Sequence, residues 1–188
     1  MEQTKPTFPT EEVTLPSKGL LYSEDSPLSK GVIEMKYMTA KEEDILTNQN
    51  YIENGTVIDK LLQSLIVTPI NYNDLLVGDK NAILVAARIL GYGSDYSFQY
   101  KGEEVNVELT DVEDKPLNEK LITKGKNTFH YTLPTSKTEV TFKILTHKDE
   151  KAIANEIKGL KKINKKVSAD VTTRMKYIIT SINGDSEK

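Results

Sequence analysis

The segment "KNAILVAARIL", residues 80–90, restricts the fold more than any other part of the chain. In a helix its apolar side chains occupy nearly every side, and Arg88 is the one charge inside it. A helix of this kind is covered by other elements all round. We therefore predict a central helix, with Asp79 capping its N-terminus and Gly91 ending it. Because Arg88 lies near the helix end, we expect its charge to reach solvent, in preference to a catalytic role.

The segments before this helix predict a strand and two shorter helices. Residues 32–37, "VIEMKY", alternate in the period of a half-buried strand. Thr39 and Glu42 are three positions apart, so each side chain can satisfy a free backbone N–H at a helix start. A second helix is predicted from Thr56, where one apolar stripe continues until Pro69 ends it.

From residue 96 the hydrophobic period changes to two, which predicts two β-hairpins. The first turns at Lys101-Gly102, and the second turns at "PTSK", residues 134–137. We expect the two hairpins to form one small antiparallel sheet. His130 falls on the face opposite its aromatic neighbours, so we expect an exposed strand histidine and no ligand role.

After the hairpins, apolar residues at helical spacing predict two amphipathic helices, over about residues 152–163 and 171–182, with Gly184 as the stop. The predicted fold class is α+β, with a helical core and an inserted small antiparallel β unit of two hairpins. The predicted parts are a mobile N-terminal arm at 1–12, a mainly helical core with an N-terminal strand at 13–95, the β-hairpin unit at 96–146, and a C-terminal helical segment packing on the core at 147–188.

Charge is unevenly distributed along the chain, although the net charge is only −3. From Lys148 onward there are ten Lys and Arg residues against six Asp and Glu residues, which leaves fifteen against twenty-two before it. Helical spacing gathers four lysines on one face, here named the lysine face: Lys158, Lys161, Lys162 and Lys165. No aromatic residue lies within this stretch, although stacking usually accompanies single-strand binding. We interpret the lysine face as solvated or as meeting an acidic protein; the alternative is a nucleic-acid-binding accessory protein.

Residue types that carry catalysis or bind metals are sparse. There is no Cys, and the two histidines, His130 and His147, leave any zinc site to be completed by carboxylates. No phosphate-binding, dinucleotide-binding, zinc-protease or Ser-His-Asp pattern is present. We therefore predict a protein that is not an enzyme, with no catalytic residues, no metal and no cofactor. No run of 18 apolar residues occurs, so we also predict no membrane span.

One segment near the N-terminus combines turn residues with apolar neighbours. Pro16 and Gly19 bracket "SK", which suits a tight turn. The turn either only connects two elements or belongs to a docking surface, because its apolar neighbours exceed what an exposed connector needs. We favour docking, with Lys18 at the polar edge and Leu20 and Tyr22 as anchors. The predicted partner-binding residues are Leu15, Pro16, Lys18, Gly19, Leu20 and Tyr22.

Three stretches together resemble one known family: "LPSKGLLY" at 15–22, "MTAKEEDIL" at 38–46 and "TTRMKYIITSINGD" at 172–185. They are similar to the baseplate hub family of T4-like contractile-tailed bacteriophages. The resemblance implies a non-enzymatic hub subunit or hub-assembly protein, either a structural subunit or an assembly chaperone, that binds other hub or baseplate proteins. It also implies a location in the cytoplasm of the infected bacterial host, or in the tail baseplate of the virion.

Two features of the chain depart from that family. Some proteins of this layout carry a Cys-x-x-Cys knuckle where this chain has "YKGEEV", so we expect Gly102 and strand pairing to hold the first hairpin without zinc. In the family the sequence continues into further helix after the third stretch, so we expect the natural protein to extend beyond Lys188.

Overall fold

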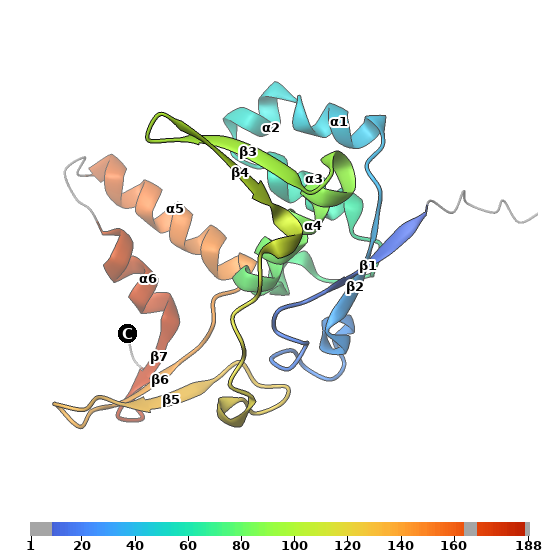
Figure 1. Cartoon of the computed structure of the whole chain (residues 1–188). Coiled ribbons are helices and arrows are strands. Elements are labelled where there is room, and N and C mark those ends of the chain that lie inside the picture. The colour runs from blue at the N-terminus through green and yellow to red at the C-terminus, as the bar shows by residue number, and fades with distance from the viewer. Residues whose placement is uncertain (1–8, 164–168, 187–188) are drawn as a thin grey trace, which may run out of the picture.

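The computed structural model describes residues 9–163 and 169–186 (Figure 1). Within these ranges the chain forms six α-helices and three small antiparallel sheets, which confirms the predicted α+β class. No helix in the described ranges combines the length and the apolar character that crossing a membrane requires.

The first sheet pairs β1 (Thr10–Thr14) with β2 (Val32–Lys36) in antiparallel register. Ile33 and Met35 are buried on one face of β2, as the alternation predicts. The N-terminal arm is shorter than predicted, because residues 10–12 pair with β2. Its polar side chains give no strand signal, and backbone pairing with β2 supplies the structure instead. Residues 1–8 of the predicted arm lie outside the described residues.

Thr39 and Glu42 form the predicted capping box at the start of α1 (Ala40–Leu46). The Glu42 carboxylate accepts hydrogen bonds from the Thr39 backbone N–H at 3.0 Å and from the Thr39 hydroxyl at 2.6 Å. A single turn, α2 (Gln49–Glu53), follows, and the side chain of Asn48 caps it. The sequence pattern does not predict α2, because five residues are too few to establish a helical period.

The predicted apolar stripe after Thr56 forms α3 (Val57–Leu65), which ends before Pro69. Three leucines of the stripe are buried: Leu61, Leu62 and Leu65. They pack in the main core together with residues of β2 and of the helix that follows, so this stripe is the centre of the N-terminal half.

The apolar helix predicted at 80–90 is α4 (Val77–Tyr92), and Gly93 ends it in place of Gly91. The predicted cap at Asp79 is wrong, because Leu76 holds the N-cap position and Asp79 lies in the first turn. Ile83 and Ala87 are fully buried, whereas the other aliphatic side chains of α4 are half-buried and Tyr92 at its end is exposed. The fully buried part of the core therefore packs against one face of α4, the face that carries Ile83 and Ala87.

The first predicted hairpin is confirmed as β3 (Asp95–Tyr100) and β4 (Glu103–Glu108). Lys101 and Gly102 have φ values of 53° and 86°, as a two-residue turn between twisted strands requires. At its base the Arg88 guanidinium donates to the carbonyl of Gly93 at 2.7 Å and lies over the Tyr96 ring, 5.7 Å from its centroid. The Arg88 guanidinium thus lies at the helix end, as expected, where it donates to backbone carbonyl groups.

The second hairpin, β5 (Phe129–Thr132) and β6 (Glu139–Phe142), belongs to a different sheet. Its third strand is β7 (Ile179–Ile182), in the order β5-β6-β7. The prediction of one sheet for both hairpins is therefore wrong. The helix predicted to 182 ends earlier, as α6 (Asp170–Ile178), because the β-branched run "IITSI" pairs with β6. His130 is exposed, as expected.

The remaining long helix, α5 (His147–Ile163), joins the C-terminal part to the core at its first residue. The His147 backbone N–H donates to the Leu75 carbonyl at 2.7 Å, and the Val77 N–H donates to the Leu145 carbonyl at 3.0 Å. In Figure 1, α5 and α6 extend from this junction on the side opposite the β1–β2 sheet. The short 3-10 helices are η1 (Pro27–Lys30), η2 (Tyr72–Asp74), η3 (Leu109–Asp111) and η4 (Glu119–Leu121).

Candidate protein-binding surfaces

The segment at 15–22 folds into a loop that is pinned to the first turn of α4. Asp79 is almost fully buried and accepts hydrogen bonds from the Ser17 backbone N–H at 2.9 Å and the Ser17 hydroxyl at 2.7 Å. It also accepts one from the Tyr22 hydroxyl at 2.6 Å, and that hydroxyl accepts from the Leu76 backbone N–H at 2.9 Å. Burial raises the pKa of Tyr22, and the charge of Asp79 raises it further. Asp79 therefore acts as an internal clasp for this loop.

Half of the predicted partner-binding residues are buried in this loop and are not available at the surface. The buried ones are Leu15, Gly19 and Tyr22. Pro16 and Leu20 are half-buried, and Lys18 is exposed. Lys18 Nζ lies 2.7 Å from Glu119 Oε1, and an exposed ion pair of this kind contributes little to stability. Because its ring is buried, Tyr22 does not present the anchor that the docking hypothesis assigned to it.

Turn geometry accounts for the glycine of this loop. Gly19 has φ of 74°, and a Cβ at this position would lie 2.4 Å from the Ser29 carbonyl oxygen. Any other residue would therefore be strained and would also clash. The backbone requires glycine here without any partner, which favours the connector interpretation of the turn.

The second resembling stretch, 38–46, also contains an internal polar contact. The buried Glu42 carboxylate accepts hydrogen bonds from Lys36 Nζ at 2.8 Å and from the Ser64 hydroxyl at 2.6 Å, in addition to those from Thr39. Burial raises the pKa of Glu42, but hydrogen bonds from Lys36, Ser64 and Thr39 outweigh that effect and lower it to about 2. Glu42 thus ties α1 to β2 and α3.

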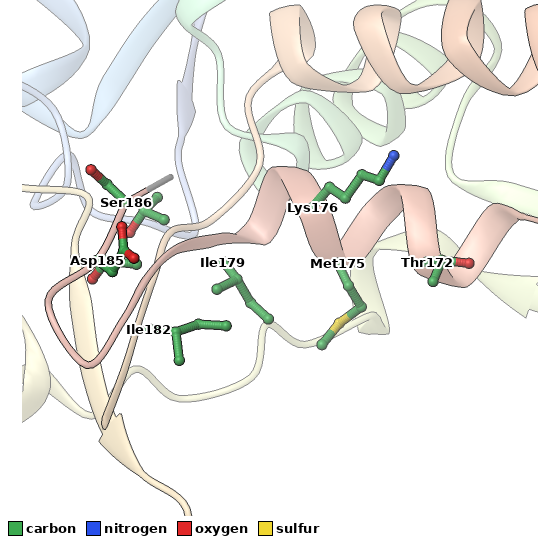
Figure 2. Close-up of a pocket in the computed structure, with 9 residues that line it drawn as sticks. Thr172, Met175, Lys176, Ile179, Ile182, Asp185 and Ser186 are labelled. Carbon is green, nitrogen blue, oxygen red and sulfur yellow. The ribbon is translucent and has the colours of Figure 1, made fainter. Parts of the chain in front are cut away.

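The third resembling stretch lines an apolar groove of about 420 Å³ along α6 and β7, here named the α6–β7 groove (Figure 2). Figure 2 shows Met175, Ile179 and Ile182 on the same side of the ribbon. Met175 is 45% exposed and Ile182 is 49% exposed. The full lining is Thr172, Met175, Lys176, Ile179, Thr180, Ser181, Ile182, Asp185 and Ser186. A contiguous apolar surface of this kind, with polar residues at its rim, is typical of an interaction site.

A second groove, of about 390 Å³, separates α5 from α6 and is here named the α5–α6 groove. Its lining is Glu150, Ile153, Ala154, Ile157, Lys158, Lys161 and Arg174. Lys158 and Lys161 belong to the predicted lysine face, and both are exposed, as is Lys162. Lys165 lies outside the described residues. The predicted basic surface therefore borders an apolar groove, which sequence spacing alone does not predict.

A third surface is the hairpin formed by β3 and β4. Tyr96, Phe98 and Tyr100 alternate along β3 and share one side of the hairpin, here named the aromatic face. They are 43, 39 and 58% exposed. Three exposed aromatic side chains in a row are unusual for a surface that faces only water.

Four polar side chains meet where α3, η2, α4 and α5 converge. Lys80 Nζ lies 2.6 Å from Asp59 Oδ1 and 3.1 Å from His147 Nδ1. The Tyr72 hydroxyl donates to Asp59 at 3.0 Å, and His147 Nε2 lies 3.5 Å from Asp59 Oδ2. Burial lowers the pKa of His147 and Lys80 lowers it further, although Asp59 opposes the shift. These side chains bind one another, so the cluster joins the C-terminal part to the core.

Among the described residues, no group of three or more metal-ligating side chains is arranged to hold an ion. No protein-family model, curated protein or solved structure matches the chain. The surfaces described above are two apolar grooves and an exposed aromatic face.

Proposed function

We propose that this chain is a non-enzymatic phage tail protein that acts in baseplate hub assembly by binding other hub or baseplate proteins through the α6–β7 groove. One observation carries the proposal: eight of the nine lining residues belong to the resembling stretch at 172–185, and Ser186 is the ninth. The stretches at 15–22 and 38–46 contribute internal hydrogen bonds to the fold, through Tyr22 and Glu42 respectively. The resemblance and the exposed apolar surface therefore coincide at 172–185.

The α6–β7 groove has the chemistry of a peptide-binding surface. Met175 has a flexible thioether side chain that adapts to differently shaped partners, and the two isoleucines add apolar area. β7 is an edge strand of its sheet, and its outer edge is bridged by Asp185 at Ile182. An extended segment of a partner could therefore pair with the β7 backbone before Ile182 while alternate side chains enter the groove. We propose an extended, apolar segment of a hub or baseplate protein as the occupant.

A structural subunit and an assembly chaperone both need such a surface, and they differ in how long the partner stays bound. The proposal therefore places the chain in the cytoplasm of the infected bacterial host during assembly, and in the tail baseplate if it is a subunit. Lifetime of the complex, measured by dilution of a purified pair, separates the two roles.

Co-expression with hub and baseplate proteins tests the proposed groove. Met175→Glu places a charge in the groove, whereas Ile52→Glu places the same charge on α2 at a residue with matched exposure, 48% against 45%. We expect Met175→Glu to reduce capture of the partner at least tenfold and Ile52→Glu to capture as well as the parent chain. Equal capture by both variants, with unchanged melting temperatures, would exclude the groove.

Nucleic-acid binding is a second candidate function, because the described lysines of the lysine face are exposed. Three lysines on one face of α5 can contact phosphates, and the neighbouring groove contains no aromatic side chain for base stacking. Such binding would be sequence-independent and would weaken steeply with salt.

A further inference from the structure

The hairpin of β3 and β4 is acidic as well as aromatic. Between 95 and 108 the chain has four carboxylates, Asp95, Glu103, Glu104 and Glu108, against the single cation Lys101. Glu103 pairs with Tyr100 in the register, so it lies at the tip of the aromatic face, and Glu104 lies on the opposite side. In Figure 1 the hairpin projects from the helical body with its turn outermost. The hairpin therefore presents exposed rings beside negative charge.

The α5–α6 groove has the opposite character. Its floor is apolar, from Ile153, Ala154 and Ile157, and three cationic side chains border it against one carboxylate. The cations are Lys158, Lys161 and Arg174. Arg174 is paired with the carboxylate of Glu150, and Lys161 lies 3.9 Å from the carboxylate of Asp170 beside the groove. Lys161 and Arg174 keep 55 and 46% of their side-chain surface exposed. This groove therefore suits an apolar or aromatic side chain that carries acidic neighbours.

We propose that the chain binds a second copy of itself by placing the β3–β4 hairpin of one copy against the α5–α6 groove of the other. Tyr100 and Phe98 contact the apolar floor, and Glu103, which shares their side of the hairpin, meets Lys158 and Lys161. Both halves of this contact are described in one chain, and their charges and apolar surfaces are complementary. The contact is separate from the α6–β7 groove and does not depend on the proposed role in tail assembly.

Repetition of the contact supports a second copy as the occupant. A stable interface buries roughly 800 Å² on each partner, which is large for one face of a short hairpin. Two chains related by a two-fold axis use the contact twice, because each contributes its hairpin and its groove. An unrelated acidic protein bound in the groove would form this contact only once and would bury only about half of the area.

Charge reversal in trans tests the contact with the purified chain. One variant carries Glu103→Lys, and the other carries Lys158→Glu and Lys161→Glu. Sedimentation velocity over a concentration series measures self-association of each variant alone and of the two mixed. The control is Lys41→Glu with Lys60→Glu, which makes the same charge change at exposed lysines of α1 and α3.

We expect the parent chain and the control to self-associate and each test variant alone to associate on the order of tenfold more weakly. The mixture should regain association, because in a mixed pair the reversed hairpin faces the reversed groove and the native hairpin faces the native groove. A misfolded variant could not regain it, so recovery also shows that both variants fold. A parent chain that remains monomeric at all concentrations, or association that persists in both variants alone, would overturn the proposal.

Discussion

The hydroxyl of Tyr22 donates a hydrogen bond to Asp79 Oδ2 at 2.6 Å and accepts one from the Leu76 backbone N–H at 2.9 Å. One side chain thereby fixes the N-terminal loop against the start of α4, 57 residues later in the chain. Hydrogen bonds to charged groups are the stronger ones in proteins, and both groups here are buried.

Removing this hydroxyl should therefore weaken the fold. We expect Tyr22→Phe to lower the free energy of unfolding by about 1.5–3 kcal/mol, because Asp79 loses a donor and the Leu76 N–H loses its acceptor. Urea denaturation measures the change. The exposed Tyr37, whose hydroxyl lies 3.2 Å from Glu11, provides the control, since Tyr37→Phe should change stability by less than about 0.5 kcal/mol. Equal effects of the two substitutions would contradict the clasp.

The two faces of α4 should respond differently to a charge. Ile83 is fully buried, so we expect Ile83→Asp to cost on the order of 4 kcal/mol or more and to prevent stable folding. Val85 is half-buried, and the carboxylate of Val85→Asp can reach water, so a cost of roughly 1–2 kcal/mol is expected. Circular dichroism with thermal melting compares the two. If both variants unfold, α4 is covered on all sides, as its composition alone predicts.

Stability should fall in mildly acidic solution because of His147. Its folded pKa lies below the ordinary 6.5, so the unfolded chain takes up this proton first as pH falls. The free energy of unfolding should therefore decrease as pH drops below about 6.5, until the folded pKa is passed. We expect His147→Gln to be less sensitive to pH over that interval than the parent chain. Parallel stability curves for the two as the pH falls below about 6.5 would contradict this role.

DNA binding separates the two candidate functions. We expect no saturable binding of a labelled oligonucleotide in fluorescence anisotropy at about 200 mM salt, and at most weak binding at about 50 mM. Lys158→Glu with Lys162→Glu should abolish any low-salt signal, because phosphate contacts would use the lysine face. Tight binding that survives at the higher salt and is lost in this variant would support the nucleic-acid alternative.

Local sequence patterns predict which helices and turns form in this chain better than they predict which elements pack against one another. Thr39 and Glu42 signal a helix start that the structure contains, and Lys101-Gly102 signals a turn with the expected positive φ values. Both signals are complete within a few residues, so no tertiary contact is needed to interpret them.

Long-range contacts account for the differences. Asp79 has the sequence position of a cap, but its partners, Ser17 and Tyr22, are 62 and 57 residues away, so spacing does not predict its burial. The run "IITSI" continues a helical period, and only pairing with β6 makes it a strand; its β-branched residues are the one local signal for that outcome. The α6–β7 groove follows from this change, so the sequence predicts its residues but not their arrangement.

The proposed role in hub assembly is tested most directly by affinity isolation of the tagged chain from phage-infected cells, with mass spectrometry of the proteins that remain bound. The account predicts that baseplate or hub proteins are enriched with the parent chain and with Ile52→Glu, and that they are lost with Met175→Glu. Recovery of no tail protein with any of the three chains, or recovery of the same tail proteins with all three, would contradict it.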